Sequence, residues 1–435
     1  MGILSSLNRE QKEAVGLLQI GTFLEYFDLM LYVHMAVLLN ELFFPKTDPH
    51  TAALLTAFAF CSTYVLRPFG ALIFGYIGDN IGRKTTVIIT TMMMSISCVI
   101  MANVPTYAEI GIAAAWIITF CRVFQGLSSM GEVMGAKIYV TEIVKPPAQY
   151  PAVTFIVIAS SLGTVCALGF ASLVTNFGFS WRIAFWIGAG IAVVGSIART
   201  RLRETPEFLQ LKRSKLKQKP ISNLNAESTN IQKKDLISYI GVECGWPFCF
   251  YLGYMYLGFV LKNEYGFSAK DVIFCNFILA LITLTSDFVL AFLSYRIHPL
   301  RIIKCKGWIF LCFAFLLPFL IVYSNDYRQI FILQAIILFI PLAGVPADSI
   351  FIKYVPVFCR FTAVTFIYAI SRAAMYVITS FGLVYLTGWF GHYGLLIIMI
   401  PVIISFLYGV NHFIKLEKEA GNFPSSRNPD KIAVA

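Results

Sequence analysis

The sequence is poor in charge: 13% of its 435 residues are Asp, Glu, Lys or Arg, while 58% are hydrophobic. Soluble proteins carry about 25% charged residues, so this chain cannot cover its surface with polar side chains. Uncharged runs recur along the chain at about the 20 residues that a helix needs to cross a bilayer. The composition therefore excludes a soluble domain and predicts an all-α protein whose main partner is the lipid bilayer.

The sequence also lacks the short motifs of several enzyme classes. It contains no Walker A, HExxH, GxSxG or CxxC motif, and its five histidines are dispersed. Most of the ten cysteines lie within apolar runs, where they act as small packing residues. We therefore expect no enzyme activity, no ATP-driven pumping, no cofactor and no metal site. The first apolar run contains Glu25 and Asp28 and has no cleavage site, so no cleavable signal peptide is expected.

Apolar runs predict twelve membrane spans. They cover residues 16–39, 52–77, 86–104, 108–141, 150–176, 180–200, 236–262, 269–296, 301–323, 328–352, 361–388 and 393–414. An even number places both termini on one side. Most of the 34 Lys and Arg residues fall on that side, which is therefore predicted to be cytoplasmic in a bacterial inner membrane. The net charge of +11 thus reports orientation, and no nucleic-acid partner is expected.

One long polar segment, 201–235, divides the spans into two groups of six. Its basic composition predicts a cytoplasmic linker with a short surface helix near Pro206–Lys215. The predicted organisation is an amino-terminal bundle (1–200), the linker (201–235), a carboxy-terminal bundle (236–414) and a short cytoplasmic tail (415–435). Two related six-helix halves are typical of secondary transporters.

The segment between the second and third spans, Arg67–Lys84, is punctuated by glycine and charge. The residues that define it are Gly75, Gly78, Asp79, Gly82, Arg83 and Lys84. Glycine allows close backbone approach and tight turns. Asp79 either pairs with Arg83 four residues later or caps the following helix. Read alone, the segment is equally compatible with an ordinary cytoplasmic turn.

In its place between spans 2 and 3, this segment resembles the signature loop of the major facilitator superfamily. The segments GTFLEYFDLMLY (21–32), RPFGA (67–71), RVFQGLSSMGE (122–132), WRIAFWIG (181–188) and RETPEF (203–208) resemble its metabolite:proton symporter branch, which includes proline/betaine, α-ketoglutarate and citrate permeases. The resemblance implies two six-helix bundles working by alternating access. In the second half it thins to a few residues, and the counterpart LSYRIHPLRII (293–303) lacks the Gly-Asp-Gly frame.

Ionisable residues inside spans are costly to bury and mark functional candidates. Glu25, Asp28 and Tyr32 share one face of span 1 at i, i+3 and i+7. Two carboxylates one turn apart raise each other's pKa, so they suit a proton carrier. The alternative is that Arg or Tyr side chains of neighbouring helices satisfy them as structural contacts.

Span 4 carries a second polar face, formed by Arg122, Gln125, Ser129 and Glu132. Arg122 either holds a substrate carboxylate through its planar fork or neutralises Glu25, Asp28 or Glu132. Glu132 is a further candidate for the proton path.

Span 11 presents a third polar face, with Tyr368, Arg372 and Tyr376 placed to meet a substrate from the second half. Aromatic residues of span 7, including Trp246 and Tyr254, either box a quaternary ammonium or, as we favour, pack between helices.

These features predict a monomeric transporter that imports a small organic solute with protons. The solute is a zwitterion such as proline or betaine, or a carboxylate, and the sequence does not decide between them. Glu25, Asp28 and Glu132 would carry the proton; Arg122, Gln125, Tyr32, Tyr368, Arg372 and Tyr376 would bind substrate. The glycine-framed segment would form a cytoplasmic gate. An exchanger of organic anions without proton coupling is the alternative, and a non-transporting sensor is less favoured because no sizeable polar domain is present.

Overall fold

The computed structural model describes residues 7–43, 64–217 and 232–423, which form helices joined by short connections and contain no strands. The first half comprises α1 (Arg9–Phe43), α3 (Arg67–Asn80), α4 (Arg83–Asn103), α5 (Tyr107–Ile110), α6 (Ile112–Ile143), α7 (Gln149–Phe177) and α8 (Trp181–Arg199). The linker helix α9 (Pro206–Lys217) follows.

The second half is more interrupted. It comprises α10 (Lys233–Glu243), α11 (Gly245–Phe250), a π-helical turn (Tyr251–Tyr256), α12 (Leu257–Tyr265), α13 (Ala269–Arg296), α14 (Pro299–Val322), α15 (Tyr327–Phe339), α16 (Asp348–Lys353), α17 (Arg360–Val377), a second π-helical turn (Ile378–Gly382), α18 (Leu383–Phe390), a 3₁₀ turn (Gly391–Gly394) and α19 (Leu395–Glu419).

Helix lengths match passage through a bilayer. Eight described helical segments are long and apolar enough to cross a membrane, and one of them, Arg360–Glu419, has 60 residues. At about 1.5 Å per residue that segment is long enough for two passes. Two shorter apolar helices, Trp181–Ile197 and Tyr327–Phe339, fall below that length and lie at two further predicted spans. With α3 they account for the twelve predicted spans, although residues 52–63 of the second span lie outside the described part.

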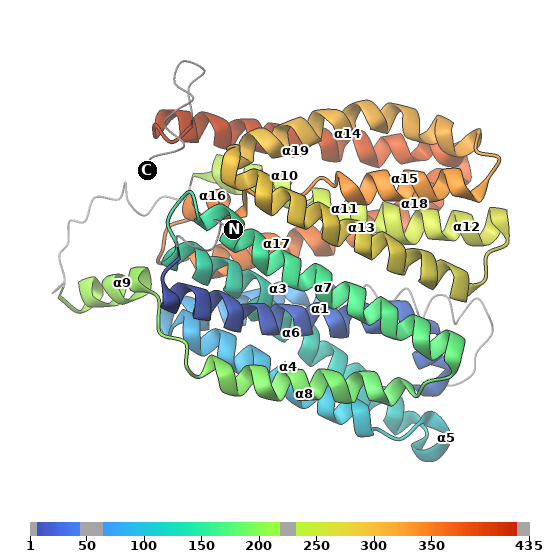
Figure 1. The fold of residues 1–435 in the computed structure, drawn as a ribbon, viewed down its shortest axis with the longest axis horizontal. Helices are drawn as coiled ribbons and strands as arrows, with labels where there is room; N and C mark the ends of the chain where they lie inside the picture. Colours follow the sequence, from blue (N-terminus) through green and yellow to red (C-terminus); the bar gives the residue numbers. More distant parts are fainter. Residues whose placement is uncertain (1–6, 44–63, 218–231, 424–435) are drawn as a thin grey trace.

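The helices form two bundles that lie one above the other in Figure 1, the first half below and the second above. The bundles meet where α3 packs along α17 and α7 packs along α13. The start of α1, the linker helix α9 and the end of α19 lie at one end of the molecule, and α5 lies at the other (Figure 1). Bulky apolar side chains cover the outside, including Trp116 (70% exposed) and Trp389 (73% exposed), which suits contact with lipid.

The predicted span 328–352 differs from the structure, because it is not one helix. The helix α15 ends at Phe339, the chain runs without helix from Ile340, and α16 starts at Asp348. Pro341 and Pro346 lack a backbone N–H and oppose helix continuation on their amino-terminal sides. Interrupted helices are tolerated inside membrane proteins where the free backbone lines a cavity. Here Pro341 and Gly344 do line one.

Candidate functional site

A cavity lies between the two bundles. It is lined by side chains of α1, α6 and α7 from the first bundle and of α10, α11, α13, α14 and α17 from the second, together with the break between α15 and α16. Its volume is ≈ 70 Å³, several times the ~10–15 Å³ that one ordered water needs. The cavity therefore sits where a solute would contact both bundles at once.

Six charged side chains line this cavity, three of each sign: Lys137, Lys306, Arg372, Glu243, Asp287 and Asp348. Four of them form two ion pairs. Lys137 Nζ donates to Asp348, joining α6 to α16 across the bundles. Arg372 Nη1 lies 3.0 Å from Glu243 Oε2 within the second bundle. Charges buried in such pairs are satisfied in place, so they hold the walls of the cavity together.

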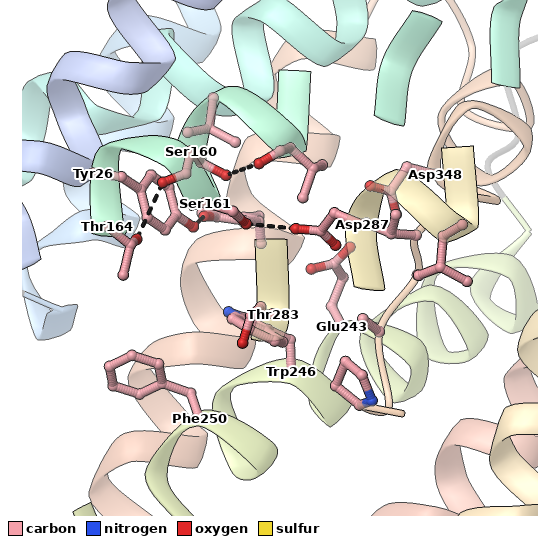
Figure 2. Close-up of a pocket in the computed structure, with 18 of the residues that line it drawn as sticks. Tyr26, Ser160, Ser161, Thr164, Glu243, Trp246, Phe250, Thr283, Asp287 and Asp348 are labelled. Carbon is pink, nitrogen blue, oxygen red and sulfur yellow. Dashed lines mark hydrogen bonds between the residues drawn. The ribbon is translucent and has the colours of Figure 1, made fainter. Parts of the chain in front are cut away.

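Asp287 is held differently. Its Oδ2 accepts a hydrogen bond from Ser161 Oγ at 2.5 Å, which joins α13 to α7 (Figure 2). Figure 2 places Glu243 and Asp348 close to Asp287, with Trp246 and Phe250 further along the wall. Aromatic rings complete the lining; the hydroxyls of Tyr26 and Tyr368, from opposite bundles, lie 3.3 Å apart. The wall thus combines acidic and basic side chains with aromatic faces that attract cations.

A second group of charges lies inside the first bundle, outside the cavity lining. Asp28 Oδ2 is 3.1 Å from Arg122 Nη1, which also donates to Gln125 Oε1 at 2.9 Å. The Arg122 guanidinium carbon lies 4.0 Å from the centre of the Tyr32 ring. The faces predicted for spans 1 and 4 therefore meet each other, and in this conformation Arg122 is occupied by Asp28.

The other two carboxylates of the predicted proton path are also buried. Glu25 accepts the backbone N–H of Val133 at 3.2 Å, and its Oε1 lies 3.9 Å from Arg67 Nη2. Glu132 Oε2 lies 2.5 Å from Arg199 Nη1, and its Oε1 accepts hydrogen bonds from Thr90 and Thr91. Glu132 is thus the better satisfied of the two, since Glu25 Oε1 has no hydrogen-bond partner among the described residues.

The glycine-framed segment joins the two bundles at the end of the molecule where α1 begins. Asp79 accepts the backbone N–H groups of Phe361 and Thr362 at 3.0 and 2.9 Å, at the start of α17. A carboxylate at a helix amino terminus satisfies free N–H groups and the helix dipole. Asp79 also lies 3.3 Å from Arg83 Nη1, so the predicted Asp79–Arg83 pair is present.

Arg83 continues this junction. It donates to the carbonyl of Gly78 at 2.6 Å within its own bundle and to the carbonyl of Val357 at 2.8 Å in the other. Glu142 of α6 lies 3.4 Å from Arg83 Nη2 and 3.2 Å from Arg360 Nη1, again from opposite bundles. This set of cross-bundle contacts closes one end of the interface.

The glycines of this segment have distinct tasks. A Cβ on Gly75 would lie 2.7 Å from the Cα of Thr362, and one on Gly78 would lie 2.5 Å from Cγ of Phe361. These two glycines thus let α3 approach α17. Gly82 has φ +153°, a backbone conformation that favours glycine, and it directly precedes α4. The backbone N–H groups of Arg83 and Lys84 then donate to Glu204 of the linker at 3.1 and 3.3 Å.

Only part of the predicted substrate set reaches the cavity. Tyr368 and Arg372 line it, whereas Arg122, Gln125 and Tyr32 form the group around Asp28. The Tyr376 ring packs 4.3 Å from that of Tyr64 across the interface. Sequence reasoning missed Glu243 and Lys306, although both are ionisable residues within apolar runs. Asp287 and Asp348 also line the cavity, and Asp348 pairs with Lys137.

Several known transporters resemble the chain in sequence. A proline/betaine transporter of Salmonella typhimurium is 33% identical over 206 residues, which is 46% of this chain and 41% of the relative. The inner membrane metabolite transport protein YhjE of Escherichia coli is 34% identical over 217 residues, 48% of this chain and 49% of the relative. The chain thus spans about half the length, or less, of these curated relatives.

Solved structures share the fold at lower identity. The proton:xylose symporter XylE bound to 6-bromo-6-deoxy-D-glucose superposes with a TM-score of 0.71 at 15% identity, covering 92% of this chain and 94% of XylE. The human organic anion transporter MFSD10 has a TM-score of 0.68 at 16% identity, covering 93% of this chain and all of that chain. At these identities the likeness concerns the fold. The family model described as Major Facilitator Superfamily matches residues 18–383. The chain, with its two helical bundles, therefore belongs to the major facilitator superfamily, a family of membrane transporters and not of enzymes.

Proposed function

We propose that the chain is a secondary active transporter that imports a small organic solute together with protons. The observation that carries this proposal is the cavity between the two bundles, which is lined by charged and aromatic side chains. At one end of the molecule, hydrogen bonds of Asp79 and Arg83 join the two bundles. Alternating access needs a central site and an interface that opens and closes at each end. Relatives named as proline/betaine transporters support a zwitterion or carboxylate as the solute.

The proposed placement is a bacterial inner membrane, with the termini and the closed end on the cytoplasmic side. An inner membrane protein among the relatives and the surplus of basic residues at that end support it. The proposed units are the bundles 1–200 and 236–414, the linker 201–235 and the tail 415–435, acting as a monomer. In this conformation the Asp79–Arg83 segment would hold the cytoplasmic gate shut.

Proton coupling is assigned to the first bundle. A proton on Asp28 would cancel its attraction for Arg122, 3.1 Å away, and free the guanidinium to turn toward the solute. Glu25, whose Oε1 has no hydrogen-bond partner among the described residues, would exchange the proton, and Glu132 would hold Arg199 in place. Tyr368 and Arg372 would contact the solute directly from the second bundle.

The test is uptake of labelled betaine, proline, α-ketoglutarate and citrate into proteoliposomes under an imposed pH gradient. We expect at least one solute to accumulate above its equilibrium level when the outside of the vesicles is more acidic than the inside. Without the pH gradient we expect no accumulation. Uptake indifferent to the gradient would favour organic-anion exchange and end the symport proposal.

Variants of the first bundle test the assignment of the proton. Glu25→Gln and Asp28→Asn are expected to abolish gradient-driven accumulation while solute exchange across the membrane persists. Full accumulation in both variants would show that the proton travels elsewhere. Glu10→Gln is the matched control, because Glu10 is an exposed residue of the same helix, 68% accessible at its side chain.

A further inference from the structure

The charges around the central cavity are paired unevenly. Of the six that line it, Lys137 is bonded to Asp348 and Arg372 to Glu243. Lys306 and Asp287 remain, and within the described part of the chain neither makes an ion pair within 4 Å. The cavity lining thus contains one basic and one acidic side chain, Lys306 and Asp287, that are not in contact with each other.

Lys306 is the more unusual of the two. Its side chain is 6% exposed, and its Nζ has no hydrogen-bond partner among the residues that the structure describes. An ammonium group has three N–H donors, and burying it unpaired costs several kcal/mol. A membrane protein keeps such a group where it faces a cavity or a ligand. Since Lys306 lines the cavity, its missing partner is expected to come from the transported solute.

Asp287, on the preceding helix α13, has a different environment. Ser161 Oγ donates to its Oδ2, so this carboxylate is held in place by a neutral group of the opposite bundle. The aromatic residues Trp246, Phe250 and Tyr254 line the same cavity. A carboxylate together with aromatic faces suits the cationic end of a solute, including an ammonium group without N–H donors.

The balance of charge narrows the solute class. The lining carries three positive and three negative side chains when all are ionised. A zwitterion keeps this balance and gives both Lys306 and Asp287 a partner, whereas a di- or tricarboxylate would add two or three uncompensated negative charges. Electrostatic balance therefore favours a solute with one carboxylate and one cationic nitrogen.

We propose that the cavity selects a zwitterion, with Lys306 of α14 binding the carboxylate and Asp287 of α13, held by Ser161, facing the cationic nitrogen. This inference rests on the proposed transport function and adds the substrate class and two recognition residues to it. It assigns the main carboxylate contact to Lys306 instead of Arg372, because Arg372 is already satisfied by Glu243 at 3.0 Å.

The test is solute exchange in proteoliposomes without a pH gradient, so that it does not depend on proton coupling. Wild-type protein is expected to exchange labelled betaine or proline. Choline, which keeps the trimethylammonium group and lacks the carboxylate, should compete about ten- to a hundredfold more weakly, the range for loss of one charged hydrogen-bonding partner. Exchange of α-ketoglutarate or citrate but of neither zwitterion would overturn the inference and leave the transport proposal standing. Exchange of none of these solutes would overturn the transport proposal itself.

Substitutions then locate the carboxylate contact. Lys306→Met should weaken betaine binding about ten- to a hundredfold and remove the preference for betaine over choline, while Lys306→Arg should keep that preference. Lys304→Met, a half-buried lysine of the same helix outside the cavity lining, is the matched control and should behave as wild type. A wild-type betaine-to-choline ratio in Lys306→Met would refute the assignment.

A stability measurement separates recognition from a structural role. Removing an unpartnered buried cation should leave the thermal midpoint of the solute-free protein unchanged or raise it, whereas removing a structural contact should lower it. Asp287→Asn should weaken betaine and choline alike, because both carry the cationic nitrogen. A lowered midpoint in solute-free Lys306→Met, or an Asp287→Asn effect limited to betaine, would contradict the proposal.

Discussion

The carboxylate of Asp79 binds Thr362 across the interface between the two bundles, accepting its backbone N–H at 2.9 Å and its Oγ1 hydroxyl at 2.7 Å. The same carboxylate accepts the N–H of Phe361 at 3.0 Å. One side chain at the end of α3 thereby caps the first turn of α17, whose Phe361 is 282 residues away in the sequence. Because this cap joins α3 of one bundle to α17 of the other, it couples the positions of the two bundles.

Asp79→Asn tests this cap directly. An amide removes the charge that attracts the helix terminus and can accept through one oxygen only, so the amides of Phe361 and Thr362 should open more often. We expect their hydrogen exchange to accelerate by about tenfold to a hundredfold, for a loss of ~1.5–3 kcal/mol. Mass spectrometry of peptides covering residues 355–365 measures it. Asp326→Asn makes the same charge-to-amide change at the cap of α15, where Asp326 accepts the N–H of Arg328 at 3.0 Å, and should leave these peptides unchanged.

Gly78→Ala tests the close approach of α3 to α17. The added Cβ would lie 2.5 Å from Cγ of Phe361, whose side chain is fully buried, so one helix must move. Overpacking of this kind costs about 1–3 kcal/mol, and we expect a lower thermal midpoint together with reduced transport. Gly190→Ala is the control: nothing lies within 4 Å of its Cβ position in α8, so the change should stabilise the helix by about 0.5–1 kcal/mol. Equal effects of the two substitutions would refute the packing argument.

Much of the architecture could be predicted from the sequence, because a long apolar run in a bilayer forms a membrane-spanning helix. The glycine-framed segment identified the family, and the Asp79–Arg83 pair was predicted from its four-residue spacing. The partner of Asp79 could not be predicted. Its contact with Thr362 depends on how the two bundles dock. The periodicity of the sequence does not show that the end of α3 lies beside the start of α17.

The cavity wall was harder to predict than the helices. Lys306 lies near the basic end of α14, close to Arg301 and Lys304, so its charge reads as part of the cytoplasmic surface. The helical position of Arg122 was predicted correctly, but helix geometry alone does not show that Asp28 occupies its guanidinium. The sequence does indicate the break before α16, since Pro341, Gly344 and Pro346 fall within six residues. The apolar run that contains them is long enough for one continuous span, and the prediction followed that length.

Glu142→Gln tests the charge network beside the cap. The Glu142 side chain is fully buried, and it faces Arg83 at 3.4 Å and Arg360 at 3.2 Å. Neutralising it leaves Arg83 with Asp79 at 3.3 Å and Arg360 with Glu207 at 2.5 Å. Because both guanidinium groups lose one charged partner but keep another, we expect a loss of about 1.5–3 kcal/mol and a lower thermal midpoint. Arg360→Gln in the same chain should restore part of the loss, since it removes one of the two cations.

The exposed pair Glu10–Arg203 provides the comparison for this network. Its side chains are 68% and 80% accessible, and solvent-exposed pairs contribute only about 0–1 kcal/mol. Glu10→Gln should therefore leave the thermal midpoint nearly unchanged. If Glu142→Gln were equally mild, the network would not hold the two bundles together at this end.

His298 gives the fold a dependence on pH. It lies between α13 and α14, and burial, helped by Arg301, lowers its pKa to about 4 even though Glu417 lies 3.9 Å from Nε2. An unfolded histidine has a pKa of about 6.5. From roughly pH 6.5 down to pH 4, the unfolded chain therefore binds a proton at this position that the folded chain does not bind. The free energy of unfolding is therefore highest, as far as His298 is concerned, above pH 6.5. It declines by on the order of 3 kcal/mol as the pH falls through this window.

His298→Phe keeps the ring between Tyr150 and Phe423, whose centres lie 6.1 and 4.8 Å away, and removes the titration. Thermal unfolding in detergent from pH 7.5 to 4.5 should therefore show a smaller decline in the midpoint for His298→Phe than for wild type. Parallel curves for wild type and His298→Phe would show that His298 is not the titrating group.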